Sequence, residues 1–386
     1  MEITERALNR AALHRQLLLE RSTLGAADAV SRLVALQAQH PASPYLALWN
    51  RVAGFDPAAL DTAFTARTVV KATLMRITLH AVRADDYAAF RAALQPTLYA
   101  SRLGARFAAA GLTPDDAHRL VPEVLRFADR PRTNADMEEW LAGRVGAERK
   151  AGAWWGLRAY APLWHVPTGG SWSFGRRPAY AAAGTGTGAM PAGREADPQA
   201  LSGLVLRYLP GFGPASVADV AQFAMVRRTA VREALSALGD AVEPLRGPGG
   251  TALFDVPGAA RPPEDAPAPP RLLGMWDNVL LAYADRSRLI PPAYRPLVTR
   301  ANGDVLPTLL VDGYVAGVWR PVEDGIEATA FHDLAPAAWD GLAEEARALT
   351  AFLADRDPRV YRTYDHWWAK LPAGVRVRVL RSGPSR

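Results

Sequence analysis

The strongest constraint on the fold is a pattern of helical runs followed by β-rich runs, which recurs three times along the chain. Each time, amphipathic helical runs are followed by two short β-rich runs. In the first copy, residues 3–21, 26–37, 44–52 and 56–67 have helical character, and TVVKATL and RITLHAV follow them. The second copy ends in LWHVPTGGSWSFG, which indicates strand, glycine-rich turn and strand, and the third ends near TALFDV.

Helix start signals support this division. Asp56 before Pro57, Thr133 before NADMEEW and Ser216 before VADVAQF are typical N-cap residues. Helices followed by a two-stranded hairpin form the order of a winged helix, in which the third helix can enter a major groove of DNA. Beyond residue 270 the chain becomes rich in β-type runs, so an α+β protein is expected, with three tandem winged helices and a β-rich, barrel-like C-terminal domain.

The boundaries of these units follow from two linker-like stretches, one rich in glycine and alanine and one rich in proline. The expected divisions are winged helix 1 at 1–84, winged helix 2 at 85–180, a linker at 181–198, winged helix 3 at 199–256, a linker at 257–270, and the β-rich domain at 271–386.

Composition narrows the class of protein. The chain has 386 residues and a net charge of +6, and only three of its 45 basic residues are lysine. This arginine bias has two interpretations, a GC-rich coding bias or the binding of a polyanion such as DNA. The absence of cysteine excludes disulfides and Cys-ligated metal sites. The charged N-terminus and the lack of a long apolar run predict a cytoplasmic protein without a membrane span.

Familiar catalytic patterns are missing. The seven histidines form no HExxH or HxH pattern, and no GxSxG or Walker A motif occurs, so neither a metal nor a cofactor is expected. Arginines near the expected wings and recognition helix are candidates for phosphate contacts, although a solvated charged surface is the alternative. They are Arg176, Arg177, Arg227, Arg228 and Arg232.

One short stretch, LQAQHP at residues 36–41, places two amides two positions apart. On a helix, Gln37 and Gln39 would point about 200° apart, whereas on an extended chain they would share a side. Pro41 favours an extended conformation at His40 and helps to end the helix. The two amides can therefore converge only if the chain leaves the helix near Ala38. By spacing alone, two polar residues near a helix end remain the simpler interpretation.

Several stretches together resemble the winged-helix DNA glycosylases of the AlkZ/YcaQ type. The stretches span residues 33–320 and are VALQAQHPASPYLALWNRV, LMRITLHAVRADDY, GFGPASVADVAQF, LLGMWDNVLLAYADRSRL and LLVDGYVAGVWR. The catalytic motif of that family is Gln-aliphatic-Gln in the AlkZ-like branch, and it falls here on Gln37 and Gln39. The resemblance also implies DNA contacts by His40, Lys71, Arg76, His80 and Arg286.

The resemblance further implies a substrate. The AlkZ-like branch includes self-resistance enzymes that excise bulky guanine adducts and unhook interstrand crosslinks made by agents such as azinomycin. The expected activity is therefore hydrolysis of the N-glycosidic bond of N7-alkylated purines in double-stranded DNA, by a monofunctional, monomeric enzyme without a cofactor. A winged-helix regulator without catalysis, or a protein that sequesters a toxin, is the alternative.

Overall fold

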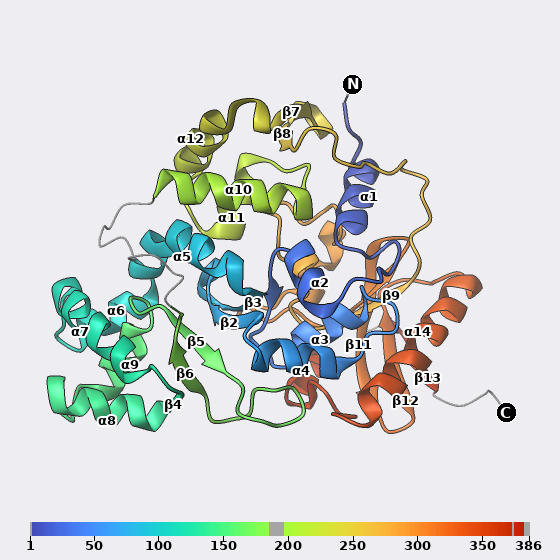
Figure 1. Ribbon diagram of the computed structural model, residues 1–386. Coiled ribbons are helices and arrows are strands. Elements are labelled where there is room, and N and C mark those ends of the chain that lie inside the picture. Colours follow the sequence, from blue (N-terminus) through green and yellow to red (C-terminus); the bar gives the residue numbers. More distant parts are fainter. Residues whose placement is uncertain (1, 185–196, 373, 382–386) are drawn as a thin grey trace.

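The computed structural model describes residues 2–184, 197–372 and 374–381. Figure 1 shows a helical group at the lower left, a second helical group with a small hairpin at the top, and a β-sheet with a long helix at the right. These parts surround a central unit of helices and strands. No helix in the described ranges is long and apolar enough to cross a membrane. The mixed α and β composition matches the expectation.

The first unit begins at well-defined helix caps. The Thr4 side chain accepts a hydrogen bond from the backbone of Ala7, and Asp56 accepts one from Ala58 while Pro57 occupies the first helical turn. The predicted start at Asp56 is thus confirmed. The elements of this unit are α1 (Glu5–Arg15), α2 (Ala26–Arg32), β1 (Leu36–Gln37), α3 (Ser43–Trp49), α4 (Pro57–Thr65), β2 (Val69–Thr73), η1 (Met75–Ile77) and β3 (Leu79–Arg83).

The predicted helix at 26–37 was wrong in its second half. Helix α2 ends at Arg32, Val34 has a left-handed φ of 69°, and β1 then pairs with β3, with Gln37 opposite His80. Every residue from 33 to 38 is buried, including Gln37. A helix would have turned part of this run towards solvent, whereas a strand on the sheet satisfies its backbone groups in the interior. The chain therefore leaves the helix five residues before Gln37.

The second unit starts its helices at capping boxes. Thr113 pairs with Asp116, and Thr133 with Asp136, each through both side chain and backbone. The predicted cap at Thr133 is confirmed. The elements are α5 (Ala84–Tyr99), α6 (Arg102–Ala109), α7 (Pro114–Phe127), β4 (Arg132–Thr133), α8 (Asn134–Val145), α9 (Lys150–Leu157), β5 (Leu163–Val166) and β6 (Ala179–Ala182).

The second hairpin differs from its predicted form. The SWSFG run is not a strand; it lies in a loop, and the strand that pairs with β5 is β6. Within this loop, Thr168 and Gly169 both donate backbone hydrogen bonds to the Ser173 carbonyl, which folds the loop on itself. Trp172 is buried and donates from its ring nitrogen to Asp357 at 3.2 Å. Contact with a distant segment thus replaces local strand pairing.

The hairpins of the first two units join into one sheet. Its order is β1-β3-β2-β5-β6-β4, and the two halves meet where Lys71 of β2 pairs with His165 of β5. Two units that look independent in the sequence therefore share a continuous six-stranded sheet.

The third unit follows the expected order. Asp197 caps its first helix, and Ser216 with Asp219 forms the predicted cap of the second as a full capping box. A hairpin closes the unit, as the TALFDV run suggested. The elements are α10 (Pro198–Phe212), α11 (Val217–Ala224), α12 (Arg228–Leu238), β7 (Glu243–Arg246) and β8 (Ala252–Asp255). The expected linker at 181–198 lies mostly outside the described residues, and 257–270 contains no helix or strand.

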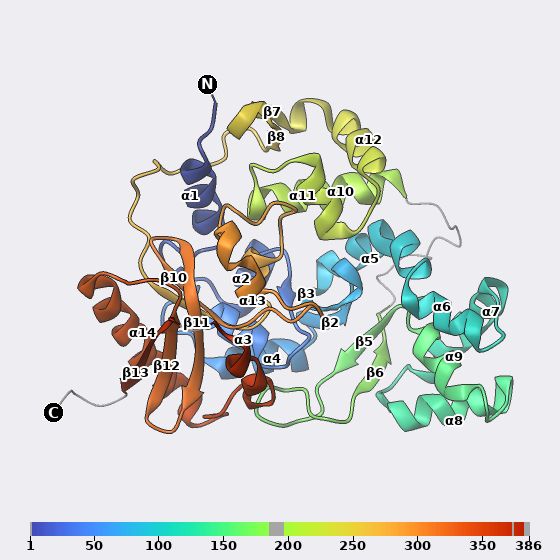
Figure 2. The ribbon, with the colours of Figure 1, turned by 180° about the vertical axis from the view of Figure 1, so that it is seen from behind.

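The C-terminal part is β-rich, as predicted, but its sheet is open in the described residues. The order is β13-β12-β11-β10-β9, so β13 and β9 are edges, and the expected barrel-like closure is absent there. The elements are β9 (Arg271–Leu273), α13 (Arg295–Val298), β10 (Thr308–Val311), β11 (Tyr314–Val322), β12 (Gly325–Ala330), α14 (Pro336–Ala354) and β13 (Arg376–Arg381). Figure 2 shows the segment between β9 and β10, which includes α13, lying over α2 and β3.

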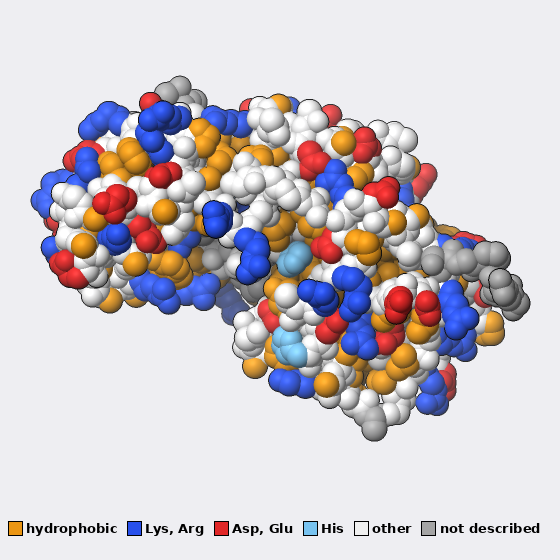
Figure 3. Space-filling model, turned by 90° about the horizontal axis from the view of Figure 1, so that it is seen from below, with side chains coloured by type: hydrophobic (Ala, Val, Ile, Leu, Met, Phe, Trp, Pro, Cys, Tyr) orange, Lys and Arg blue, Asp and Glu red, His pale blue; other side chains and the backbone are white. Residues whose placement is uncertain are grey.

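Two large hydrophobic cores hold these parts. One continuous core includes buried residues of the first, third and C-terminal units, whereas helices α6 to α9 pack round a core of their own that includes Val124, Met137 and Leu141. Figure 3, a view from below, accordingly shows two lobes, with the α6–α9 lobe at the left and a hollow beside it.

Polar clusters connect the units across the large core. Asp61 of α4 accepts hydrogen bonds from Tyr45 and from Ser173, each at 2.6 Å, and pairs with Arg356 just beyond α14. The Arg356 guanidinium and these hydrogen bonds lower the pKa of Asp61, although its partial burial acts in the opposite direction. One carboxylate thereby fixes the first unit, the loop of the second hairpin and the C-terminal part against each other.

Candidate functional site

The side chain of Gln37 is held in one orientation. Its amide nitrogen donates to the Thr78 hydroxyl at 3.1 Å, and its oxygen accepts from the Arg76 guanidinium at 3.0 Å. Because a guanidinium can only donate, the atom that faces Arg76 must be the oxygen, which settles the direction of the amide. Gln37 is 4% exposed, so these contacts lie in the interior.

Arg76 reaches Gln37 from the turn between β2 and β3. Arg76 and Ile77 are consecutive residues with φ of 53° and 57°, a left-handed conformation that is costly for β-branched residues. This turn brings the guanidinium back over the sheet. Its Nη1 atom is buried and has no hydrogen-bond partner among the described residues. A buried donor without a partner is uncommon and often marks a site that a ligand completes.

His80 is neutral and in a defined tautomer. Arg76 donates to its Nε2 at 3.1 Å, so Nε2 must be unprotonated, and Nδ1 then donates to the Thr78 carbonyl at 3.1 Å. Burial, and next the Arg76 charge, lower the pKa of His80 to about 3. Near neutral pH, His80 therefore acts as a fixed hydrogen-bond acceptor for Arg76, and it does not act as a general acid.

The low pKa of His80 predicts a pH-dependent contribution to stability. Between about pH 6.5 and the folded pKa of about 3, His80 is protonated in the unfolded chain but stays neutral in the folded protein. The contribution of His80 is thus complete above pH 6.5 and falls by about 1.4 kcal/mol for each pH unit below it. Urea unfolding measures the free energy of unfolding of wild type and of His80→Gln at neutral and at mildly acidic pH. As the pH falls below 6.5, wild type should lose about 1.4 kcal/mol more per pH unit than His80→Gln does. A difference that is independent of pH would contradict a neutral His80.

Gln39 lies beside Gln37 but is far less constrained. It is exposed, and its side-chain oxygen accepts only a long hydrogen bond, 3.4 Å, from the backbone of Leu79. Both amides therefore contact neighbouring residues of one short segment, Thr78 and Leu79. One amide is fixed and enclosed, and the other is exposed and weakly bonded.

The surroundings of this pair are cationic and come from three units. Arg76 lies over the ring of Phe223 in α11, with its guanidinium carbon 5.4 Å from the ring centroid. Burial lowers the pKa of Arg76 to about 10, and repulsion from Arg286 adds to this effect. Arg286, in the segment between β9 and β10, is in turn repelled by Arg295. The guanidinium groups stay charged at neutral pH and give the site a positive potential.

Lys71 lies apart from the predicted DNA contacts Arg76 and His80. Register alternation puts Lys71 on the face of the sheet opposite to Gln37 and His80. Lys71 is 4% exposed with its amine 4.3 Å from the Phe174 ring centroid, and burial lowers its pKa to about 8. His40 packs edge-on against Tyr361. DNA contacts by His40 and Lys71 stay predictions, with the Lys71 amine enclosed in this structure.

The remaining predicted arginines lie on the surface. Arg176 and Arg177 are exposed in the loop that leads into β6, and Arg227, Arg228 and Arg232 are exposed at the start of α12. Arg227 lines a groove of about 1420 Å³ that Ile77, in the turn between β2 and β3, also lines. Contact with DNA by these five arginines stays a prediction.

Sequence reasoning missed Thr78. Its hydroxyl and carbonyl contact Gln37 and His80, yet a single threonine in a β-rich run has no pattern that distinguishes it. Only the pairing of β1 with β3, which are about 40 residues apart, brings Thr78 to the amide.

Comparison with known proteins was made for the whole chain. A family model described as "DNA glycosylase AlkZ-like" matches residues 30–352. The chain is 28% identical over 341 residues to an interstrand DNA cross-link repair glycosylase of Streptomyces sahachiroi, covering 83% of this chain and 89% of the relative. The structure of Streptomyces sahachiroi DNA glycosylase AlkZ superposes with a TM-score of 0.77 at 22% identity, covering 91% of this chain and 96% of that one. The residues of the Gln37 site lie within the matched range.

Proposed function

Since the chain belongs to the AlkZ-like family of DNA glycosylases, we propose that it hydrolyses the N-glycosidic bond of N7-alkylated purines in double-stranded DNA. The proposal includes bulky adducts and interstrand crosslinks. The observation that supports it most is the pair of amides over Thr78 and Leu79, one of them locked by Arg76. Such a site can orient a water molecule but contains no strong acid or base.

The chemistry of the substrate suits this site. Alkylation at N7 makes the purine a cation, so the base leaves as a neutral molecule with the electron pair of the glycosidic bond. No general acid is needed. The sugar carbon C1′ gains oxocarbenium character, a water oxygen bonds to it, and the released proton passes to solvent. Unmodified guanine would depart as an anion and should survive, because a glutamine cannot supply a proton.

The two amides have different roles in this proposal. Gln39 is exposed and weakly bonded, so its oxygen is available to accept a hydrogen bond from the attacking water. Gln37 is fixed by Arg76 and Thr78, so its role in this proposal is to hold the site beside the deoxyribose in one geometry. Orientation of a reactant in this way can contribute several kcal/mol to catalysis. Both residues act by position, with no change of protonation.

Arg76 supplies the link to the DNA backbone. Its Nη2 holds Gln37 and His80, while its Nη1 has no partner among the described residues. A phosphate oxygen next to the damaged nucleotide would satisfy this donor through a charge-assisted hydrogen bond. Binding of the duplex would then complete the hydrogen bonding of Arg76.

The decisive experiment offers wild-type protein three duplexes of one sequence, which contain N7-methylguanine, an N7–N7 interstrand crosslink or unmodified guanine. We expect abasic product from the first two duplexes and none from the third. Spontaneous loss of the base without protein gives the background rate. If the protein binds DNA but no cationic purine is released above background, the proposed activity is wrong and a non-catalytic binding protein is favoured.

A further inference from the structure

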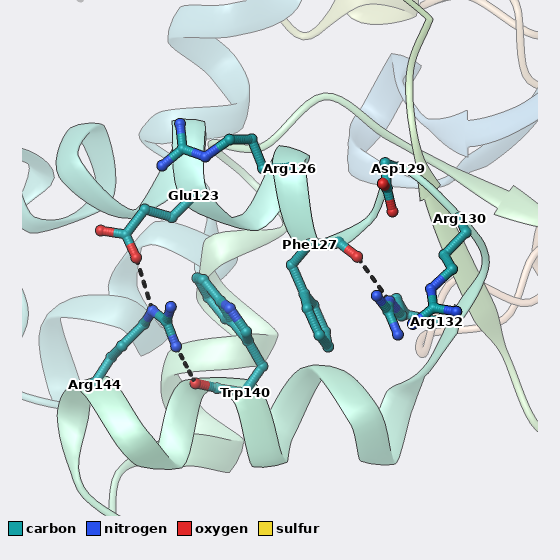
Figure 4. A pocket seen from close by; sticks show the side chains of 8 residues that line it. All are labelled: Glu123, Arg126, Phe127, Asp129, Arg130, Arg132, Trp140 and Arg144. Atoms are coloured by element: carbon teal, nitrogen blue, oxygen red, sulfur yellow. Dashed lines mark hydrogen bonds and ion pairs between the residues drawn. The ribbon is translucent and has the colours of Figure 1, made fainter.

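A stack of arginine and aromatic side chains stands on the α6–α9 lobe, away from the Gln37 site. The Arg132 guanidinium lies 4.1 Å from the centroid of Phe127, Phe127 stacks on Trp140 at 5.7 Å with 19° between the rings, and Arg144 lies 4.0 Å from Trp140. Figure 4 shows the order Arg144, Trp140, Phe127, Arg132 along the stack. Each ring thus has a neighbour on both faces.

The two outer guanidiniums are fixed in place. Arg132 donates from Nε to the Phe127 carbonyl at 2.7 Å. Arg144 donates to Glu123 at 2.8 Å and to the Trp140 carbonyl at 3.0 Å. These contacts use only some of the five N–H donors of each guanidinium, so the others remain available to a ligand. Because the two side chains are already held in place, ligand binding would cost little further side-chain entropy.

Two more arginines share the same hollow of about 620 Å³, Arg126 at the end of α7 and Arg130 in the turn before β4. Both are exposed, and neither guanidinium makes a hydrogen bond or an ion pair with a described residue. Of the two carboxylates that line the hollow, Glu123 is already bonded to Arg144. The hollow is therefore rich in unused guanidinium donors.

We infer that this hollow is a second DNA-binding site, which holds the phosphodiester backbone of the duplex outside the catalytic site. Guanidinium groups match phosphate oxygens in pairs. Because both faces of Phe127 and Trp140 are covered, a base has no ring on which to stack, so the contact is with the backbone and independent of sequence. The site would anchor the α6–α9 lobe, which has its own core, on the DNA. This inference rests on the proposed function, since it takes DNA as the polyanion.

The test removes the two free arginines and keeps the stack. We expect Arg126→Ala/Arg130→Ala to bind a long undamaged duplex less tightly than wild type when full-length protein is titrated at several salt concentrations. The plot of the logarithm of the association constant against the logarithm of the salt concentration has a negative slope. This slope should become less steep by about 2, since each lost phosphate contact contributes about 0.9. The weaker binding should be overcome by raising the protein concentration, because the catalytic residues are untouched.

The matched control is Arg102→Ala/Arg347→Ala, which also removes two exposed arginines without an ion pair among the described residues, one from α6 and one from α14, neither of them in the hollow. Its slope should stay close to that of wild type. Equal affinity losses and equal slopes for the two double variants would overturn the inference, because net charge alone would then explain the effect. Failure of the proposed function is a separate result, in which wild type releases no damaged base while the difference between the double variants persists.

Discussion

Replacing either glutamine of the Gln37 site by alanine is expected to lower the rate of N7-methylguanine release on the order of 100-fold under single-turnover conditions. Gln37→Ala removes the acceptor for Arg76 and leaves a cavity beside Thr78, whereas Gln39→Ala removes only an exposed amide. Affinity for DNA should change little in Gln39→Ala. The measurement is single-turnover excision with protein in excess over the damaged duplex.

The control for this prediction is Asn302→Ala, which removes an exposed side-chain amide from the turn between α13 and β10. Its rate should equal that of wild type. If Gln37→Ala and Gln39→Ala both excise at the wild-type rate, the assignment of the catalytic motif is wrong even when the protein proves to be a glycosylase. A loss in Gln37→Ala alone would indicate that Gln39 does not hold the water.

The largest effect on stability is expected at the ion pair between Arg51 and Asp277. Two hydrogen bonds of 2.8 and 2.6 Å join them, and their side chains are 0% and 1% exposed. The pair links the chain just after α3 to the segment after β9. Asp277→Ala would leave a buried guanidinium without its counter-charge, so we expect a loss of about 3–5 kcal/mol in the free energy of unfolding. Urea unfolding, followed by circular dichroism, measures this loss.

A surface pair provides the comparison. Arg376 and Asp333 lie 2.7 Å apart, but their side chains are 58% and 81% exposed, so water screens the interaction. Asp333→Ala should therefore leave the unfolding midpoint close to that of wild type. If Asp277→Ala and Asp333→Ala shift the midpoint equally, the buried pair does not fasten the first unit to the C-terminal part.

Local sequence determined much of the framework. The N-caps at Asp56, Thr133 and Ser216 lie where the sequence predicted them, because a side chain that caps a helix bonds to a backbone group two or three residues away. The hairpin of the third unit was likewise predicted. A catalytic role for the two glutamines is predicted only by the resemblance to a family, since their spacing alone favoured two polar residues near a helix end.

The tertiary structure decided what local patterns could not. Whether residues 33–37 continue a helix depends on β3, a strand about 40 residues away that pairs with β1. The same pairing brings Thr78 and Arg76 to Gln37, and the register of β2 places Lys71 on the opposite face.

What the sequence by itself determined about this protein is therefore its helix starts at Asp56, Thr133 and Ser216 and its basic character. Only the tertiary structure decided which side chains meet at the site, which face each one takes, and that two hairpins share one sheet. The physical reason is that strand pairing and its register are fixed by contacts between distant segments, and a shift of one residue would turn every side chain of the strand to the other face.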